Sequence, residues 1–260
     1  MNNPISKCLL FSCLALFLLG TTPKDQREYY QISIYHFKTP EQKAAIDSYL
    51  KNAWMPAIHK LGMKNIGVFS PIANDTSADK KIVVVLPAKS LKDIIDLPVK
   101  LSKDEAFQVA GQNFIGPNYN EPSFSRIENI ILYAFPLAPV LQLPNLHSTK
   151  GDRVYELRSY ESPSEKLFRN KVQMFNEGGE VTLFKRLNFN AVFYAEVIAG
   201  SSMPNLMYMT SFENMADRDA HWKTFSADPE WKKLSTDPGY QHNVSRADIT
   251  LMRVADYSDY

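Results

Sequence analysis

The stretch VYELRSY, residues Val154–Tyr160, decides the fold because a diverged counterpart, YYQISIY, already stands at Tyr29–Tyr35. Both stretches are rich in aromatic and aliphatic residues and are bounded by polar ones, which favours a strand in each case. They lie about 125 residues apart. Self-similarity at a fixed separation predicts two related units within one chain.

A helix follows each of these strands in the sequence pattern. The first begins at Thr39-Pro40-Glu41-Gln42 and the second at Ser162-Pro163-Ser164-Glu165. Each start offers a hydroxyl N-cap, a proline in the first turn, and Gln or Glu three residues after the cap. Pro56 interrupts the first helix and Gly178-Gly179 interrupts the second at nearly the same point. Since proline and glycine break helices by different means, the shared position indicates an interruption that belongs to the fold.

The remaining elements correspond as well. Lys60–Pro71 and Arg186–Glu196 each lead from a helix end into a strand, and Gly62 and Asn188 both tolerate a left-handed position after a helix. Next come a strand, a second helical region and a closing strand: Ile82–Leu86 with Leu206–Ser211, Ser102–Gln112 with Ala216–Leu234, and Ser125–Glu128 with Ser245–Asp248. The order β-α-β-β-α-β, twice, predicts an α+β fold of two tandem ferredoxin-like modules.

The chain divides into four parts. Lys7, a short apolar run and a small-residue exit predict a secretory signal peptide at residues 1–23, too short to span a membrane. The first, diverged module occupies residues 24–136, a linker rich in Pro and Leu occupies 137–150, and the second module occupies 151–260.

This N-terminal signal predicts an exported protein, periplasmic or associated with the envelope, without a transmembrane helix once the signal is removed. Retention of the signal as an anchor is the alternative. Both cysteines, Cys8 and Cys13, lie in this segment, and whether Cys13 is lipidated stays open. Removal of the segment leaves a mature chain without cysteine, and therefore without a disulfide or a thiolate nucleophile.

The overall charge sets limits on the partners. The chain has 260 residues, 45% of them hydrophobic, and a formal net charge of +1. Nucleic-acid-binding proteins usually carry a clear basic excess, so a nucleic-acid partner is not expected.

A family resemblance rests on the second module. After VYELRSY and the interrupted helix comes ENMADRDAHWKTFSADPEWKKL, residues Glu213–Leu234, whose most specific part is Asp228-Pro229-Glu230-Trp231, preceded by Arg218 and His221-Trp222. In this pattern residues Arg153–Ala255 resemble the NIPSNAP family. The first module resembles it weakly and lacks the Asp-Pro-Glu-Trp stretch.

The resemblance implies a dimeric α/β barrel, in which two ferredoxin-like sheets face each other and helices cover the outside. The two modules of one chain would form this barrel, and pairing of two chains into a homodimer stays open. Related barrel families include oxygenases, other small-molecule enzymes and haem-binding enzymes, while the NIPSNAP proteins themselves have no settled reaction.

Alternate residues of a strand share a face, which defines a candidate pocket. The apolar side of the first strand, with Ile32 and Ile34, is expected to meet the helices, so the opposite side would face the barrel interior. The candidate pocket residues on that side are Gln31, Tyr35, Glu156, Arg158 and Tyr160. A carboxylate, a guanidinium and phenols inside a barrel are suited to orienting a polar ligand or transferring a proton. The alternative is a mutually satisfied Glu156–Arg158 pair that fixes the packing.

His221 completes the candidate pocket because it lies in the segment that matches the family best. It is a candidate general base or ligand of a metal or haem, and the alternative is a structural helix residue beside a core of Trp222, Phe225 and Trp231. No histidine has metal-ligand spacing, and no phosphate or dinucleotide loop is present in the sequence. No metal and no cofactor are therefore predicted, with haem or a small ligand left open.

These observations predict a protein that binds a small, partly apolar molecule between the two modules. One alternative is a cofactor-independent oxygenase or an isomerase that uses Glu156, Arg158 or His221, and another is a protein-interaction scaffold. Whether the protein is an enzyme stays open. An open interior with unpaired polar groups favours a ligand, whereas a filled interior with Glu156 and Arg158 paired favours a scaffold.

Overall fold

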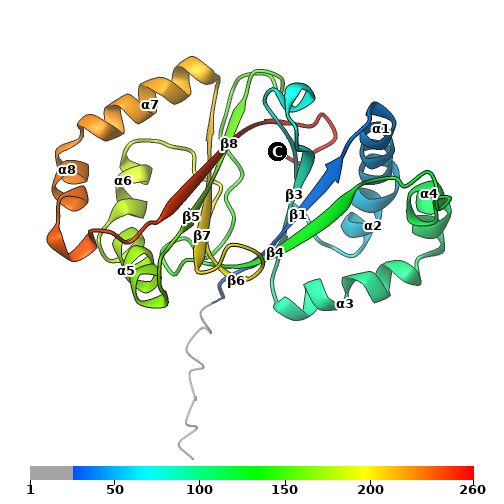
Figure 1. Cartoon of the computed structure of the whole chain (residues 1–260), viewed down its shortest axis with the longest axis horizontal. Coiled ribbons are helices and arrows are strands. Elements are labelled where there is room, and N and C mark those ends of the chain that lie inside the picture. The colour runs from blue at the N-terminus through cyan, green and yellow to red at the C-terminus, as the bar shows by residue number, and fades with distance from the viewer. Residues whose placement is uncertain (1–25) are drawn as a thin grey trace, which may run out of the picture.

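Eight antiparallel strands close into one barrel in the computed structural model, which describes residues 26–260 (Figure 1). The predicted signal peptide, with Cys8 and Cys13, lies outside the described residues.

Both halves of the described chain have the order β-α-β-β-α-β, with extra short helices. The elements of the first half are β1 (Tyr29–Phe37), α1 (Pro40–Tyr49), a π-helical turn (Leu50–Trp54), α2 (Met55–Lys60), β2 (Gly67–Pro71), a 3₁₀ turn (Asn74–Thr76), β3 (Lys80–Ala88), α3 (Leu91–Ser102), α4 (Glu105–Ile115) and β4 (Arg126–Ala134). Those of the second half are β5 (Val154–Glu161), α5 (Glu165–Asn176), α6 (Glu180–Arg186), β6 (Phe193–Ala199), β7 (Asn205–Phe212), α7 (Met215–Ala227), α8 (Pro229–Ser235), a 3₁₀ turn (Pro238–Tyr240) and β8 (Arg246–Val254).

The strand order confirms the predicted fold class. The first half has the order β4-β1-β3-β2 and the second β8-β5-β7-β6, which is the same ferredoxin-like order counted within each half. β2 pairs with β8 and β4 pairs with β6, and these two seams join the sheets. Because both seams lie within one chain, the barrel closes without a second copy. The division of the chain at residues 137–150 stays a prediction.

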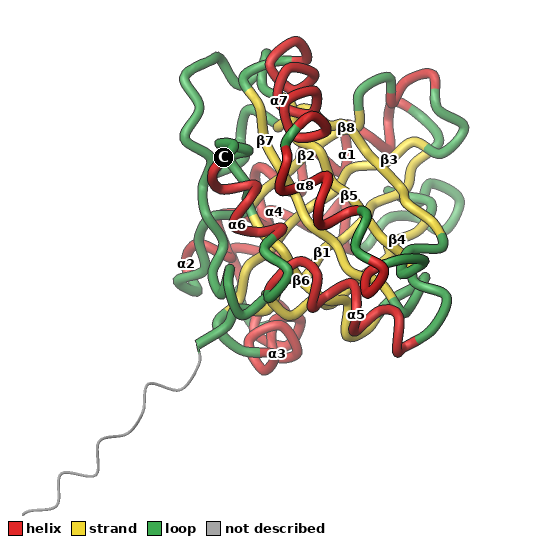
Figure 2. Tube along the Cα trace, turned by 90° about the vertical axis from the view of Figure 1, so that its left-hand side faces the viewer, coloured by secondary structure: helices red, strands yellow, loops and turns green. Residues whose placement is uncertain are grey.

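Helices cover the outside of the barrel in two groups. Figure 1 shows α1–α4 on one side and α5–α8 on the other, and Figure 2 looks onto the second group with the strands behind it. Between each group and the sheet lies a buried apolar cluster, and a third cluster fills the inside of the barrel. The molecule therefore has three cores, one central and two lateral.

The centre of the barrel is packed with side chains. Inward-facing residues of all eight strands form the central cluster, and the C-terminal Tyr260 adds to it with only 4% of its surface exposed. The ring of Phe69 lies 4.9 Å from that of Tyr155 and 5.3 Å from that of Tyr260. The barrel centre is therefore a hydrophobic core.

Local sequence signals positioned most of these elements. Thr39 caps α1 by accepting a hydrogen bond from the Gln42 amide, as predicted. The predicted cap Ser162 is wrong: Ser164 caps α5, while the Ser162 hydroxyl donates to the Asn243 carbonyl. Proline at position 163 thus precedes the helix instead of lying in its first turn.

Two further predictions about helices are corrected by the structure. The second helical region of the first half starts earlier than Ser102, because α3 precedes α4. In the second half Asp228 separates α7 from α8 and caps α8, so the predicted single region is two helices. The predicted left-handed positions after the helices are confirmed, with φ of 82° at Gly62 and 55° at Asn188.

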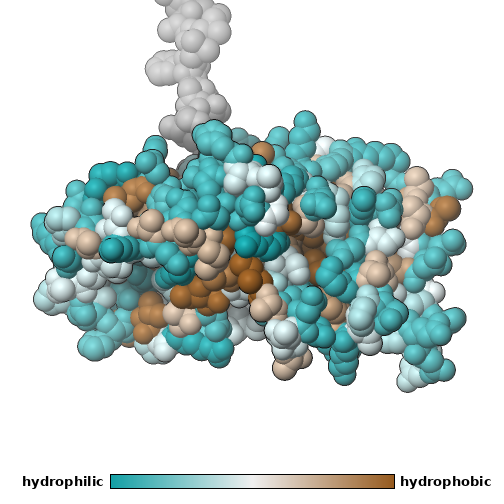
Figure 3. Space-filling view, turned by 90° about the horizontal axis from the view of Figure 1, so that it is seen from above, coloured by the Kyte–Doolittle hydropathy of each residue, from teal (hydrophilic) through white to brown (hydrophobic). Residues whose placement is uncertain are grey.

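The surface is mixed in character. Figure 3 shows one face on which hydrophilic residues dominate and hydrophobic ones gather near the middle. Among residues 26–260, none of the helices has the length and hydrophobicity needed to cross a bilayer.

Candidate functional site

The alternation of side chains along β5 places the polar residues on the helix side of the sheet. Tyr155 and Leu157 belong to the central barrel cluster, whereas Tyr160 packs against the lateral cluster beneath α5–α8. The same holds for β1, where Ile32 lies in the barrel and Tyr35 lies under the helices. The prediction that the polar faces line the barrel interior is therefore wrong. Its error was to assign the apolar side to the helices, although a closed barrel needs apolar side chains at its centre.

Glu156 is the anchor of a polar network on this face. Its carboxylate has no exposed surface and accepts hydrogen bonds from three groups on β5 and α7. Arg158 Nε donates to Oε1 at 2.6 Å, Arg218 Nε donates to Oε2 at 2.7 Å, and Trp222 Nε1 donates to Oε2 at 2.9 Å. A buried carboxylate needs such partners, and α7 supplies two of them across the sheet–helix interface.

Arg158 connects this carboxylate to a pair of phenols. Its Nη1 donates to the Tyr160 hydroxyl at 2.9 Å, and the Tyr160 and Tyr208 hydroxyls lie 3.0 Å apart. The guanidinium also lies 3.6 Å from the centre of the Trp222 ring, a cation–π contact. Burial alone would lower the pKa of Arg158, but Tyr208, Tyr160 and Glu156 outweigh it and raise the pKa. Arg158 is therefore a fixed positive charge.

The helix break supplies a second buried ion pair. Gly179, with φ of 92°, ends the turn between α5 and α6, and Glu180 is the first residue of α6. This turn brings Glu180 to Lys171 on α5, with 3.0 Å between Nζ and Oε2. Both residues are buried, with 4% and 2% of their surface exposed. The ammonium also faces the rings of Phe175 and Tyr160, at 4.7 and 5.7 Å.

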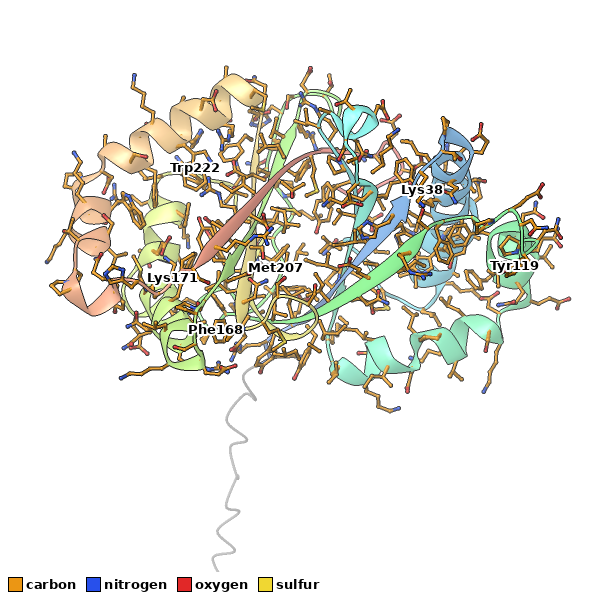
Figure 4. The ribbon with its side chains drawn as sticks, in the orientation of Figure 1. Lys38, Tyr119, Phe168, Lys171, Met207 and Trp222 are labelled. Carbon is orange, nitrogen blue, oxygen red and sulfur yellow. The ribbon has the colours of Figure 1, made fainter. Side chains whose placement is uncertain are left out.

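These groups surround a pocket of about 370 Å³ between the sheet and helices α5–α8. Its charged lining residues are Arg158, Lys171, Arg218 and Glu180, three cations and one carboxylate. Trp222, Phe225 and Trp231 supply an apolar wall. Figure 4 shows Trp222 and Lys171 on this side of the barrel, whereas Met207 lies centrally among the strands. Glu156 is fully buried and does not line the pocket itself. Asp219, which also pairs with Arg218 at 2.8 Å, is exposed to water.

Two buried hydroxyls on this face have no hydrogen-bond partner among residues 26–260. They are Tyr194 Oη on β6 and Thr210 Oγ1 on β7. Tyr194 stacks on Tyr208 with 5.6 Å between ring centres, and Thr210 lies opposite Glu156 in the strand register. Burial raises the pKa of Tyr208 and of Tyr194, with Tyr160 adding to the first shift and Glu180 to the second. Both phenols are therefore neutral donors at physiological pH.

The structure brings together only part of the predicted pocket. Arg158 and Tyr160 line it and Glu156 supports it. Gln31 and Tyr35 lie on the helix side of the first-half sheet, away from this pocket. His221 lies outside the lining: its Nδ1 contacts the Asp217 carbonyl at 2.9 Å, and its ring packs 5.5 Å from Phe189.

Three charged residues and one tyrosine that line the pocket were not predicted as site residues from the sequence. Lys171 and Glu180 flank the glycine break, Tyr208 lies across from Arg158 on β7, and Arg218 was noted only as part of the family pattern. A signal for Arg218 existed, because Arg218 and Trp222 are one helical turn apart and thus share a face. Among the described residues, no cluster of His, Cys, Asp and Glu is arranged to hold a metal ion.

Solved structures with the same fold define the class of protein as a dimeric α/β barrel. A proposed monooxygenase of Lactobacillus acidophilus is 11% identical, with a TM-score of 0.58, over 88% of this chain and 94% of its own. An anthrone oxidase-like protein is 8% identical, with a TM-score of 0.54, over 88% and 92% of the two chains. At these identities the likeness concerns the fold alone.

The NIPSNAP family model matches residues 155–259, within the second half of the chain. The match covers Arg158, Tyr160, Lys171, Glu180, Tyr208, Arg218 and Trp222. A NIPSNAP family protein of unknown function from Agrobacterium tumefaciens is 20% identical over 43% of this chain and 96% of its own, with a TM-score of 0.37. None of the curated proteins compared with the chain matches it.

Proposed function

We propose that the second half of the chain binds a small, partly apolar anion in the pocket between β5, β7 and α7. The observation that carries this proposal is the pocket lining, in which three cationic side chains and one carboxylate stand beside two tryptophans and a phenylalanine. A carboxylate or phenolate would pair with the cations, and an aromatic or alkyl body would lie against the tryptophans.

The filled barrel centre argues against a ligand enclosed there. The Glu156–Arg158 pair is also formed, and these two features are the ones expected of a scaffold. The pocket under α7 lies apart from that centre, however, and it is open to solvent.

A matched series of aromatic probes tests the charge of the ligand. 2-Naphthoate and the neutral 2-naphthylmethanol would be titrated into the protein, with tryptophan fluorescence and calorimetry as readouts. We expect naphthoate to bind at least about tenfold more tightly, because a charge-assisted hydrogen bond forms only with the carboxylate. Equal affinity for the two probes, or no binding of either, would contradict the proposal.

Two variants locate the binding. Arg158→Gln removes one cation and is expected to weaken naphthoate binding about tenfold, whereas Arg126→Gln, at an exposed arginine of the first half, is not. Ser226→Phe provides a test that keeps the ion pairs, because Ser226 lines the pocket from the exposed side of α7. It is expected to abolish binding while the circular dichroism spectrum stays unchanged.

We also propose that the chain acts after export, in the periplasm or at the envelope, on the strength of the sequence pattern of residues 1–23. Fractionation of cells that express the full chain tests this. Recovery in the cytosol at full length would contradict it.

A further inference from the structure

A second cavity, of about 290 Å³, opens at one end of the barrel and is lined by both halves of the chain. Its floor is formed by inward-facing side chains that cap the central cluster, among them Val83, Ile130, Leu157 and Met207. Its rim is formed by residues near strand ends. Glu161 is the last residue of β5, and Arg246 is the first of β8. The cavity is therefore a barrel mouth with an apolar floor and a polar rim.

The rim carries more negative than positive charge. Glu128, Glu161 and Asp248 face two cations, Lys81 and Arg246. Arg246 pairs with Asp248 at 3.0 Å and reaches Glu161 only at 3.9 Å. Lys81 lies 3.6 Å from Asp79, outside the lining. Of the two remaining carboxylates, Glu128 has one titratable neighbour among the described residues, His36, whose Nε2 lies 3.2 Å from it. Glu128 thus has no lysine or arginine partner among the described residues and Glu161 has only the distant Arg246, while both lie next to an apolar floor.

We infer that the barrel mouth binds a small organic cation with an apolar tail, its ammonium group at Glu128 and Glu161 and its tail on Leu157 and Met207. An ammonium has donors for carboxylates and no acceptor, so the excess of carboxylates selects it over an anion. β5 then serves two sites, because its even-numbered residues face the anion pocket and its odd-numbered residues face the barrel mouth. This inference does not depend on the proposed function.

Three probes of equal length test the inference on the full-length Ser226→Phe variant, in which the anion pocket is blocked and cannot take up hexanoate. n-Hexylammonium, hexan-1-ol and hexanoate would be compared by calorimetry and by saturation-transfer NMR. We expect hexylammonium to bind about tenfold more tightly than hexanol, and hexanoate more weakly than either. The inference is overturned if hexanoate equals or exceeds hexylammonium, or if none of the three binds.

Variants assign the binding to the barrel mouth. Glu128→Gln with Glu161→Gln is expected to remove the preference for hexylammonium over hexanol, whereas Glu177→Gln, at an exposed position just after α5, keeps it. Thr250→Phe, made in the Ser226→Phe background, fills the cavity without removing a charge and is expected to abolish binding of all three probes. Ser226→Phe, which blocks the anion pocket, leaves hexylammonium binding intact. Retention of the preference in the double variant would overturn the inference, whatever the outcome with naphthoate.

Discussion

The two sheet–helix interfaces of this barrel have the same topology, but the first is almost wholly apolar and the second contains a network of charged residues. In the first half, Tyr35, Val84 and Leu86 pack against α1, α2 and α4 in an almost wholly apolar cluster. Its polar residues, Gln31, Ser33 and Asn129, form a small neutral hydrogen-bonded group at its margin. In the second half, the equivalent strands carry Glu156, Arg158 and Tyr208, and the helices supply further charges.

The first half shows that this fold needs no buried charge at that position. Ser33 lies opposite Val84 in the register, whereas Arg158, at the corresponding place, lies opposite Tyr208. Buried ion pairs are often no more stable than hydrophobic replacements, so a network that the fold does not require points to a role in binding. The comparison therefore supports placing the proposed anion pocket in the second half of the described residues.

The largest expected effect comes from removing the anchor of the network. Glu156→Gln leaves two partly buried arginines with a neutral partner, and we expect it to lower the free energy of unfolding by about 3 kcal/mol. Gln31→Ala, at the corresponding position of the first half, removes neutral hydrogen bonds and is expected to cost less than about 1 kcal/mol. Urea denaturation followed by circular dichroism measures both. Similar costs for the two would show that the interfaces do not differ energetically.

Replacing the whole network sharpens the comparison. The combination Glu156→Leu, Arg158→Met and Arg218→Leu leaves no charge of this group unpaired and gives the second interface the character of the first. We expect this variant to be more stable than Glu156→Gln, because it avoids buried charges without partners. We also expect it to lose naphthoate binding. Tight binding in this variant would separate the network from the proposed function.

The helix break is the second difference between the halves. At Pro56 the first helix continues through a π-helical turn, because proline cannot donate to the carbonyl one turn earlier. At Gly178-Gly179 the second helix stops and restarts, and the restart presents Glu180 to Lys171. The two interruptions therefore have different outcomes, and the second contributes Glu180 to the anion pocket.

Gly179→Ala tests whether the break holds the pocket in place. With φ of 92°, this position is strained for any residue with a side chain, and we expect a cost of about 1–2 kcal/mol and weaker naphthoate binding. Gly151→Ala is the control, because its nearest neighbour would be 3.9 Å from the new Cβ and its φ is not positive. Pro56→Ala is expected to leave naphthoate binding unchanged. A neutral effect of Gly179→Ala would show that α6 tolerates another path.

The comparison also shows how far sequence reasoning reached. Strand and cap patterns around Tyr29–Tyr35 and Val154–Tyr160 predicted the fold class, since alternation and N-caps are local properties. The faces of the strands were inverted because both sides of each sheet are buried, so hydrophobicity alone does not distinguish the barrel interior from the helix side. Lys171 and Glu180 could not be paired in advance, because their contact depends on the path of the chain through Gly179.

The smallest predicted effect concerns how residues 147–148 are held against the second half. Glu213 accepts hydrogen bonds from the amides of His147 and Ser148, at 2.9 and 2.7 Å. Hydrogen bonding from Ser148 and His147 lowers the pKa of Glu213 from 4.5 to about 2. Because the pKa of Glu213 is lower in the folded than in the unfolded protein, its carboxylate stabilises the fold at pH values above 4.5. This stabilisation is lost as the pH falls toward about 2.

Glu213→Gln tests this contact in acid. Because the carboxylate is near the surface, we expect the variant to be less stable at pH 7 by no more than about 1 kcal/mol. The difference from the wild type should shrink as the pH falls below 4.5 and vanish near pH 2, as the wild-type carboxylate becomes protonated. Thermal melts at several pH values measure it, with Glu121→Gln, an exposed glutamate of the first half, as control. A difference that is independent of pH would assign the effect of the substitution to packing and not to the charge of Glu213.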